Sequence, residues 1–252
     1  MSQTLIRTLV FALIILVSSS TLYTFNPLLF KPAFAIPPDQ TTVVLSTWVI
    51  HRNKSADTFS AISDFAGDVY FVAANASKIG RLIPLTSTFT EWTLPSASSR
   101  PGLHGIAFDP ASGNVYFAET NKIGRLIPLN STITEWTLPG NSYNVFRITA
   151  GFDGIYLASA NTNKIGRLVP LTSTFTEWTL PSSFGKPNGI AFDPSSGNVY
   201  FAETNASKIG RLIPLTSTFT QWVIGSSPLV ITVSPAGGCF FVDNIGRVGR
   251  LS

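Results

Sequence analysis

The sequence is poor in the residues that most often carry chemistry. Its 252 residues include one cysteine, one methionine and two histidines. The single Cys239 excludes an intramolecular disulfide, so strand pairing and packing must hold the fold together. There is no G-x-S-x-G motif, no CxxC pair and no glycine-rich phosphate loop. The sequence therefore gives no support for serine hydrolase, zinc or nucleotide chemistry.

Charge is also sparse. Charged residues make up 12% of the chain and the mean hydropathy is +0.28, which favours a folded, largely buried chain over a disordered one. No segment of the repeats described below carries apolar residues at helical spacing over three turns, so a helical fold is excluded.

One sequence repeat, in contrast, occurs four times. Copies occupy residues 69–92, 114–136, 155–178 and 198–222, and a decayed fifth copy closes the chain from residue 239. The five tryptophans mark the period, with spacings of 44, 44, 42 and 44 residues: Trp48, Trp92, Trp136, Trp178 and Trp222. A period in the forties made of short apolar runs is typical of a β-propeller, with one small sheet per repeat.

Each repeat contains four short strands separated by turn signals. In one copy these are residues 105–108, 114–119, 122–128 and 132–138, which we name strands A to D. In a propeller, strand A lines the central channel and strand D lies outermost. Trp136, on strand D, is therefore expected to pack between neighbouring blades, as are the other four tryptophans.

The two ends of the repeat region determine the number of blades. Residues 41–50 match strand D alone, whereas the C-terminus supplies strands A (230–233), B (239–243) and C (247–251) and no D. Paired together, they complete a fifth blade and leave no free sheet edge. The sequence thus predicts an all-β, monomeric propeller of five four-stranded blades, closed by the N-terminal outer strand; an open arc completed by a second chain is the alternative.

The N-terminus predicts export. Residues 8–30 carry no charge, residues 9–17 are strongly apolar, and Arg7 precedes them. Ala33 and Ala35 form a small-x-small cleavage pattern, as in a signal peptide, but the uncharged stretch could also span a bilayer and attach the chain to a membrane. We divide the chain into a leader or anchor (1–35) and one propeller domain (36–252). Either alternative places the propeller outside the cytoplasm, secreted or anchored to the outer face of the cell membrane.

The basic balance does not predict a nucleic-acid partner. The net charge is +4 and the pI is about 9.3, but ten of the 17 basic residues are the paired positions of five K-x-G-R motifs. These are spread around the ring, one pair per blade, and form no single patch. We expect them either to pair with acids such as Glu91, Glu135 and Glu177 or to lie exposed to solvent. Four N-x-S/T sites are either glycosylation acceptors or turn residues: Asn53, Asn75, Asn130 and Asn205.

Positions where the repeats differ are the candidates for function, because ligands of propellers meet the channel mouth. The residue that opens strand A is His104, Phe146, Asn188 or Leu229, according to the blade. The residue that ends strand B is Glu119 or Glu203 in two blades, Ala73 or Ser159 in two others, and Asp243 or Asn244 in the last. The channel mouth is thus predicted to contact a small molecule, a peptide or a protein.

The repeat resembles that of the streptogramin B lyase family, also called virginiamycin B lyases, and the wider group of NHL and gluconolactonase-like (SMP-30) propellers. The resemblance is carried by GNVYFAET, KIGRLIP, T-E-W-T-L-P and P-x-H/N-G-I-A-F-D-P, and covers residues 41–252. It implies a propeller that opens the ester of a cyclic depsipeptide by elimination, a carbon–oxygen lyase reaction, with Mg²⁺ and histidines at the channel mouth. Members of the family have seven blades, so this chain resembles a shortened form.

The resemblance assigns roles to three residues. His104 matches a motif histidine and would transfer a proton, a task that suits an imidazole whose pKa is near neutrality. Glu119 and Glu203 match a motif glutamate and could bind Mg²⁺. The family also uses a second histidine, where this chain has Asn188, Phe146 or Leu229, and an acid where it has Gly102.

Each of these residues also has a structural interpretation. His104 and Asn188 could bond to backbone, Glu119 and Glu203 could cap the B–C turn or pair with Lys122 and Lys208, and Asp109 and Asp193 precede Pro as turn acids. Two hypotheses follow. The first is a non-catalytic binding propeller outside the cytoplasm, favoured by the near-identity of the repeats. The second is a Mg²⁺-dependent lyase that uses His104, favoured by the resemblance.

Overall fold

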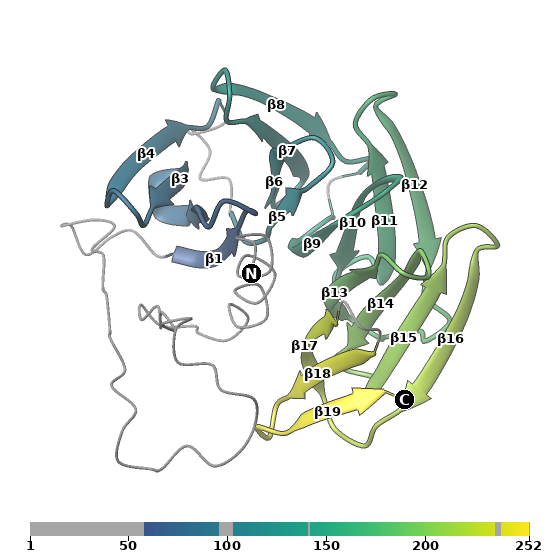
Figure 1. The fold of residues 1–252 in the computed structure, drawn as a ribbon. Helices are drawn as coiled ribbons and strands as arrows, with labels where there is room; N and C mark the ends of the chain where they lie inside the picture. The colour runs from purple at the N-terminus through teal and green to yellow at the C-terminus, as the bar shows by residue number, and fades with distance from the viewer. Residues whose placement is uncertain (1–57, 96–102, 141, 235–237, 252) are drawn as a thin grey trace, which may run out of the picture.

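A computed structural model describes residues 58–95, 103–140, 142–234 and 238–251 (Figure 1). Blade I comprises β1 (Thr58–Ser63), β2 (Val69–Ala73), β3 (Lys78–Ile83) and β4 (Thr88–Thr93); blade II comprises β5 (Ile106–Asp109), β6 (Asn114–Glu119), β7 (Lys122–Ile127) and β8 (Thr132–Thr137). Blade III comprises β9 (Val145–Gly151), β10 (Gly154–Ser159), β11 (Lys164–Val169) and β12 (Thr174–Thr179); blade IV comprises β13 (Pro187–Asp193), β14 (Asn198–Glu203), β15 (Lys208–Ile213) and β16 (Thr218–Val223). Blade V comprises β17 (Pro228–Val233), β18 (Cys239–Asp243) and β19 (Val248–Leu251).

The strands form five antiparallel sheets in simple sequential order, four of four strands and one of three. This confirms the all-β architecture of five blades. The described strands follow an arc from β1–β4 round to β17–β19, with the first strand of each blade on the inside (Figure 1). The strand predicted at residues 41–50, which would close the ring and complete blade V, lies outside the described residues.

Two local details differ from the sequence prediction. A single 3₁₀ turn, η3 (Ala74–Ala76), follows β2 where no helix of any kind is expected. The last blade begins its strand A at Pro228, two residues earlier than predicted. A β-bulge interrupts the alternation of apolar and polar side chains there, but the strand continues to pair on the other side of the bulge.

The glycine of the K-x-G-R motif has a packing reason. In blade II, Gly124 on β7 lies opposite Phe117 on β6, and a Cβ at Gly124 would lie 2.0 Å from the Phe117 ring. The same pairing recurs in blade I, where a Cβ at Gly80 would lie 2.1 Å from Phe71. In these two blades, strand C therefore needs a residue without a side chain, so that the aromatic ring of strand B can cover it.

The core lies between the blades. Four of the five buried clusters each join two adjacent blades. Each of these four clusters contains or contacts one tryptophan: Trp92 between blades I and II, Trp136 between II and III, Trp178 between III and IV, and Trp222 between IV and V. Trp136 Nε1 donates to Ser173 Oγ at 3.0 Å and Trp178 Nε1 donates to Ser217 Oγ at 2.9 Å, in each case across a blade boundary. The predicted packing of the tryptophans holds for these four; Trp48 lies outside the described residues.

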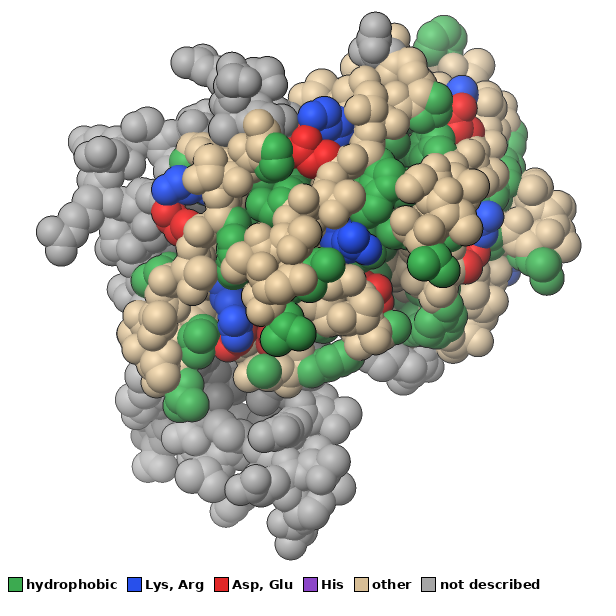
Figure 2. Space-filling model, turned by 90° about the horizontal axis from the view of Figure 1, so that it is seen from above, with side chains coloured by type: hydrophobic (Ala, Val, Ile, Leu, Met, Phe, Trp, Pro, Cys, Tyr) green, Lys and Arg blue, Asp and Glu red, His purple; other side chains and the backbone are tan. Residues whose placement is uncertain are grey.

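The motif lysines pair with the predicted glutamates. The Nζ–Oε2 distance is 2.7 Å for Lys78–Glu91, 2.7 Å for Lys122–Glu135 and 3.2 Å for Lys164–Glu177. Figure 2 accordingly shows basic and acidic side chains next to one another at several separate places on this face.

The motif arginines behave differently from the lysines. Arg81 pairs with Asp68 and Arg167 with Asp153, which the sequence analysis did not predict. Five arginines also lie over aromatic rings, at 5.3–5.8 Å from the centroid: Arg81, Arg125, Arg167, Arg211 and Arg250.

Candidate functional site

A β-bulge at the start of the innermost strand creates the variable positions of the channel mouth. In blade III, Arg147 pairs with Ala158 and Val145 with Ser159, so Phe146 is the extra residue. In blade V, Leu229 is the extra residue in the same way. The ladders of blades I and IV shift at the corresponding place, which puts Asn188 in this position in blade IV.

His104 occupies the equivalent position in blade II. Its backbone N–H donates to Ala118 O at 3.1 Å, and Ala118 N donates to Gly105 O at 2.8 Å. The imidazole is half-buried and lies against the Phe146 ring, with 4.7 Å between centroids. Burial lowers the pKa of His104, so the ring is neutral at pH 7 and can accept a proton.

The residues that end strand B are all buried, and the register resolves the ambiguity in blade V. Asp243 pairs with Pro228 as Glu203 pairs with Pro187, so Asp243 is the equivalent residue and Asn244 is not. Glu119, Glu203 and Asp243 are 3%, 0% and 2% exposed. A buried carboxylate is costly unless it is bonded, so its partners show what it does.

Two of these carboxylates have partners of a structural kind. Asp243 accepts hydrogen bonds from the backbone N–H of Ile245 and Arg247 at 3.1 and 2.8 Å, and from Arg247 Nε at 2.8 Å. Burial alone would raise the pKa of Asp243, but these bonds and the nearby Ser226 side chain hold it well below its usual range. In blade IV, Gln221 Nε2 donates to Glu203 Oε1 at 2.6 Å, while Glu203 Oε2 has no hydrogen-bond partner in the described part of the chain.

Lys208 does not bond to Glu203, contrary to one sequence interpretation. Its Nζ lies 3.0 Å from Ser182 Oγ and 3.4 Å from Gln221 Oε1. In blade II, Lys122 lies opposite Glu119 in the ladder, and its Nζ bonds to Glu135 at 2.7 Å. The hydrogen bond to Glu135 is the main reason why the pKa of Lys122 is raised, with Glu119 adding a smaller contribution.

The donor set does not fit the Mg²⁺ that the family resemblance implies. Within the four described ranges, no group of three or more His, Cys, Asp or Glu side chains lies close enough to hold a metal ion. Glu119 and Glu203 belong to different blades, and each ends its own strand B. Mg²⁺ requires near-octahedral oxygen coordination, and a single buried carboxylate supplies little of it.

The remaining predicted residues lie in turns or at the strand ends next to them. Asp109 Oδ1 accepts from Ala111 N at 3.0 Å, and Asp193 Oδ1 accepts from Ser195 N at 3.0 Å. Among the glycosylation candidates, Asn130 and Asn205 are exposed, and Asn130 Oδ1 accepts from Thr132 N at 3.1 Å. Asn75 lies in η3, and Asn53 is outside the described residues.

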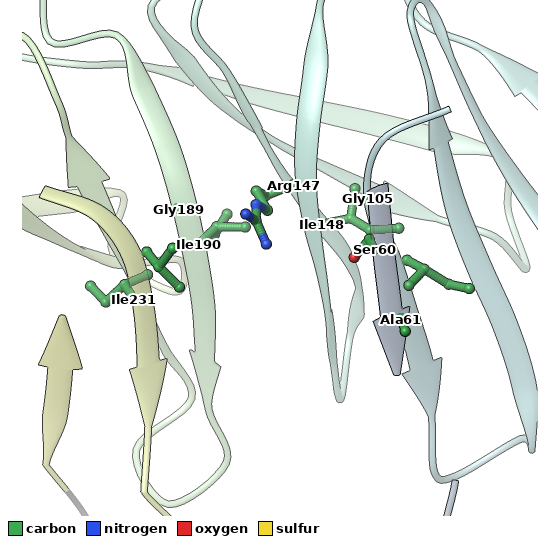
Figure 3. Close-up of a pocket in the computed structure, with 10 residues that line it drawn as sticks. Ser60, Ala61, Gly105, Arg147, Ile148, Gly189, Ile190 and Ile231 are labelled. Carbon is green, nitrogen blue, oxygen red and sulfur yellow. The ribbon is translucent and has the colours of Figure 1, made fainter. Parts of the chain in front are cut away.

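Below the bulges, the innermost strands enclose a cavity of about 130 Å³. Two residues from each of the five blades line it. The upper ring, next to the bulge residues, comprises Ser60, Gly105, Arg147, Gly189 and Val230, and the lower ring comprises Ala61, Ile106, Ile148, Ile190 and Ile231. Figure 3 shows Arg147 reaching into the space between Ile148 on one side and Gly189 and Ile190 on the other.

Arg147 was not predicted from the sequence, although the repeats contain the signal. Arg147 follows Phe146 as Gly105 follows His104 and as Gly189 follows Asn188. Blade III has an arginine at this position, where two other blades have glycine. This difference between the repeats is as large as the differences among the residues that open strand A at the channel mouth.

The comparisons with known proteins agree with this geometry. A model of the virginiamycin B lyase family matches residues 41–252. Among solved structures, the chain is similar to a catalytically inactive virginiamycin B lyase variant from Staphylococcus aureus with Quinupristin, at 26% identity and a TM-score of 0.74, over 85% of this chain and 72% of that one. A streptogramin B lyase structure gives 26% identity and a TM-score of 0.72, over 83% and 72%.

A component of a nidogen/laminin complex shares the fold alone, at 14% identity and a TM-score of 0.64, over 82% of this chain and 80% of that one. A search of curated proteins finds no matching relative.

Proposed function

The chain belongs to the virginiamycin B lyase family, and on that premise we propose that it is a non-catalytic binding propeller that acts outside the cytoplasm. Its ligand, a small molecule, peptide or protein, meets the channel mouth at His104, Phe146, Asn188 and Leu229. The proposal includes residues 1–35 as a leader or anchor that exports the propeller. In the described part of the chain, no helix is long and apolar enough to cross a membrane.

The observation that carries this proposal is the separation of the lyase-like residues. One histidine and one glutamate are on blade II, the second glutamate is on blade IV, and the described residues bring no metal-binding group together. Glu203 is bonded to Gln221, and His104 packs on Phe146. An enzyme needs its acid, base and electrophilic groups around one reacting atom. A binding surface needs only shape and a few polar contacts.

Lyase activity is the second candidate, and a specific observation favours it. His104 lies at the channel mouth as a neutral imidazole, and the similar Staphylococcus aureus structure contains Quinupristin. In an elimination, such an imidazole would take a proton from the carbon next to the breaking C–O bond, and the ester carboxylate would leave. The product is an isomer of the substrate, whereas hydrolysis would add a water.

The test is incubation of the full chain with quinupristin, with and without Mg²⁺, followed by liquid chromatography, because elimination leaves the mass unchanged. The proposal predicts no ring-opened product above a protein-free control. Metal-dependent opening that is lost in His104→Ala and kept in Asn188→Ala would overturn it in favour of the lyase. Cell fractionation with an antibody against the propeller tests the location; recovery in the cytoplasm alone would contradict it.

A further inference from the structure

The strongest unassigned feature of the molecule is Arg147, the one charged side chain among the described residues that line the cavity. Its strand, β9, lies between β5 and β13, and the upper-ring residues of these two neighbours are Gly105 and Gly189. A Cβ at Gly105 would lie 2.9 Å from Phe146 O and 3.0 Å from Arg147 Cα. The neighbouring strand therefore approaches too closely for a side chain at Gly105, and the arginine beside it faces bare backbone.

Arg147 differs from every other arginine in the described ranges. Five of those others lie over aromatic rings, and the sixth, Arg247, pairs with Asp243. Arg147 has no ion pair, no ring contact and no side-chain hydrogen bond among the described residues. Arginines are normally paired or stacked when protein surrounds them, so this one is available to a ligand.

The surroundings of Arg147 also disfavour an isolated positive charge. The side chain is exposed to water in the cavity, yet the enclosing walls desolvate the guanidinium and lower its pKa. An arginine stays protonated in spite of such a shift. A bound anion would compensate the charge that the protein itself leaves uncompensated.

The cavity supplies further donors. The innermost strands are the inner edges of the described sheets, so their free edges carry backbone N–H groups, which can donate to an anion, in alternation with C=O groups. Ser60 adds a hydroxyl group from blade I. A volume of about 130 Å³ holds several waters or one small oxyanion, and excludes a large ligand.

From these observations we propose that the channel contains a binding site for a small oxyanion, a phosphate or a carboxylate, with the Arg147 guanidinium as its principal donor. A planar guanidinium can donate two parallel hydrogen bonds to two oxygens of either group. The site does not depend on whether the mouth binds or cleaves its ligand, since it uses none of the residues assigned there.

The test is calorimetric titration of the full chain with inorganic phosphate and, separately, with acetate, at constant ionic strength. The site predicts saturable binding of at least one of the two anions, and the anion that binds more tightly shows whether the site prefers a phosphate or a carboxylate. Arg147→Gln removes the charge and the forked donor, so affinity should fall about tenfold or more. Arg250→Gln removes an exposed arginine outside the cavity, and should leave affinity within about twofold, as expected for a distant, independent site.

Circular dichroism checks that both variants keep the sheet. If Arg147→Gln does not fold, Arg147→Lys takes its place in the titration. Lysine keeps the charge but cannot donate two parallel hydrogen bonds, so this variant should bind the anion more weakly than the wild type. Three results would each overturn the proposal. The wild type and the folded Arg147 variant could bind the anion with equal affinity, Arg250→Gln could lose as much affinity as the Arg147 variant, or the wild type could show no saturable binding of either anion.

Discussion

Replacing Gly124 with alanine tests the packing rule that repeats around the propeller. The new Cβ would lie 2.0, 2.1 and 2.8 Å from three ring atoms of Phe117, a side chain that is 0% exposed. Ordinary carbon contacts are about 3.5–4.0 Å, so the ring must move by more than an ångström. Overpacking of this kind costs about 1–3 kcal/mol. The lower entropy of alanine in the unfolded chain offsets about 0.4–1 kcal/mol of this cost.

The expected result is a net loss of about 1–2 kcal/mol in the free energy of unfolding, a large share of the roughly 5–15 kcal/mol of a typical domain. Urea denaturation measures it as a shift of the midpoint at constant slope. Leu129→Ala, at a side chain 96% exposed, is the control and should change stability by less than about 0.5 kcal/mol.

Blade III suggests the compensating change, because Leu157 stands there in the place of Phe117. Phe117→Leu combined with Gly124→Ala should therefore cost less than the sum of the two single changes, by about 0.5 kcal/mol or more. A neutral Gly124→Ala, or strictly additive effects in the double variant, would refute the reasoning.

Two further predictions concern stability. Ser217→Ala leaves Trp178 Nε1 without its partner and should cost about 0.5–1.5 kcal/mol in urea denaturation, whereas an unchanged midpoint would show that the bond contributes nothing. His104→Asn, which copies Asn188 of blade IV, should flatten the dependence of the melting temperature on pH. Because burial lowers the pKa of His104, the unfolded chain takes up this proton first as the pH falls. The wild type should therefore lose stability relative to His104→Asn as the pH falls below the ordinary histidine pKa of about 6.5, and keep a constant difference above it; parallel profiles throughout would contradict this.

Much of the fold could be predicted because the same pattern of strands and turns occurs several times in the sequence. Turn residues such as Asp109 and Pro110 end each run, and alternation within the runs determines which side chains face the next blade. The register and the tryptophan packing follow from this. The bulge could not be predicted, since an extra residue in strand A leaves the alternation unreadable around Phe146 and Leu229.

The candidate site was harder to predict, because side-chain partners depend on tertiary geometry. Comparison of the repeats found the mouth positions, but it could not show that Glu203 bonds to Gln221 or that His104 packs on Phe146. The pairing of Arg81 with Asp68 was not predicted because Asp68 lies in the turn between β1 and β2 whereas Arg81 is on β3, and no motif links the two. Arg147 was not predicted because it directly follows the bulge residue Phe146, where the side-chain alternation does not show which residues face the channel.

The ring-opening assay tests the central claim most directly. Full-length protein, quinupristin and Mg²⁺ are incubated together, and the substrate and its isomer are separated by chromatography. The account predicts that the substrate remains intact with and without the metal. Turnover that requires Mg²⁺ and disappears in His104→Ala would contradict it, and would mean that a lyase can work with one histidine at its channel mouth.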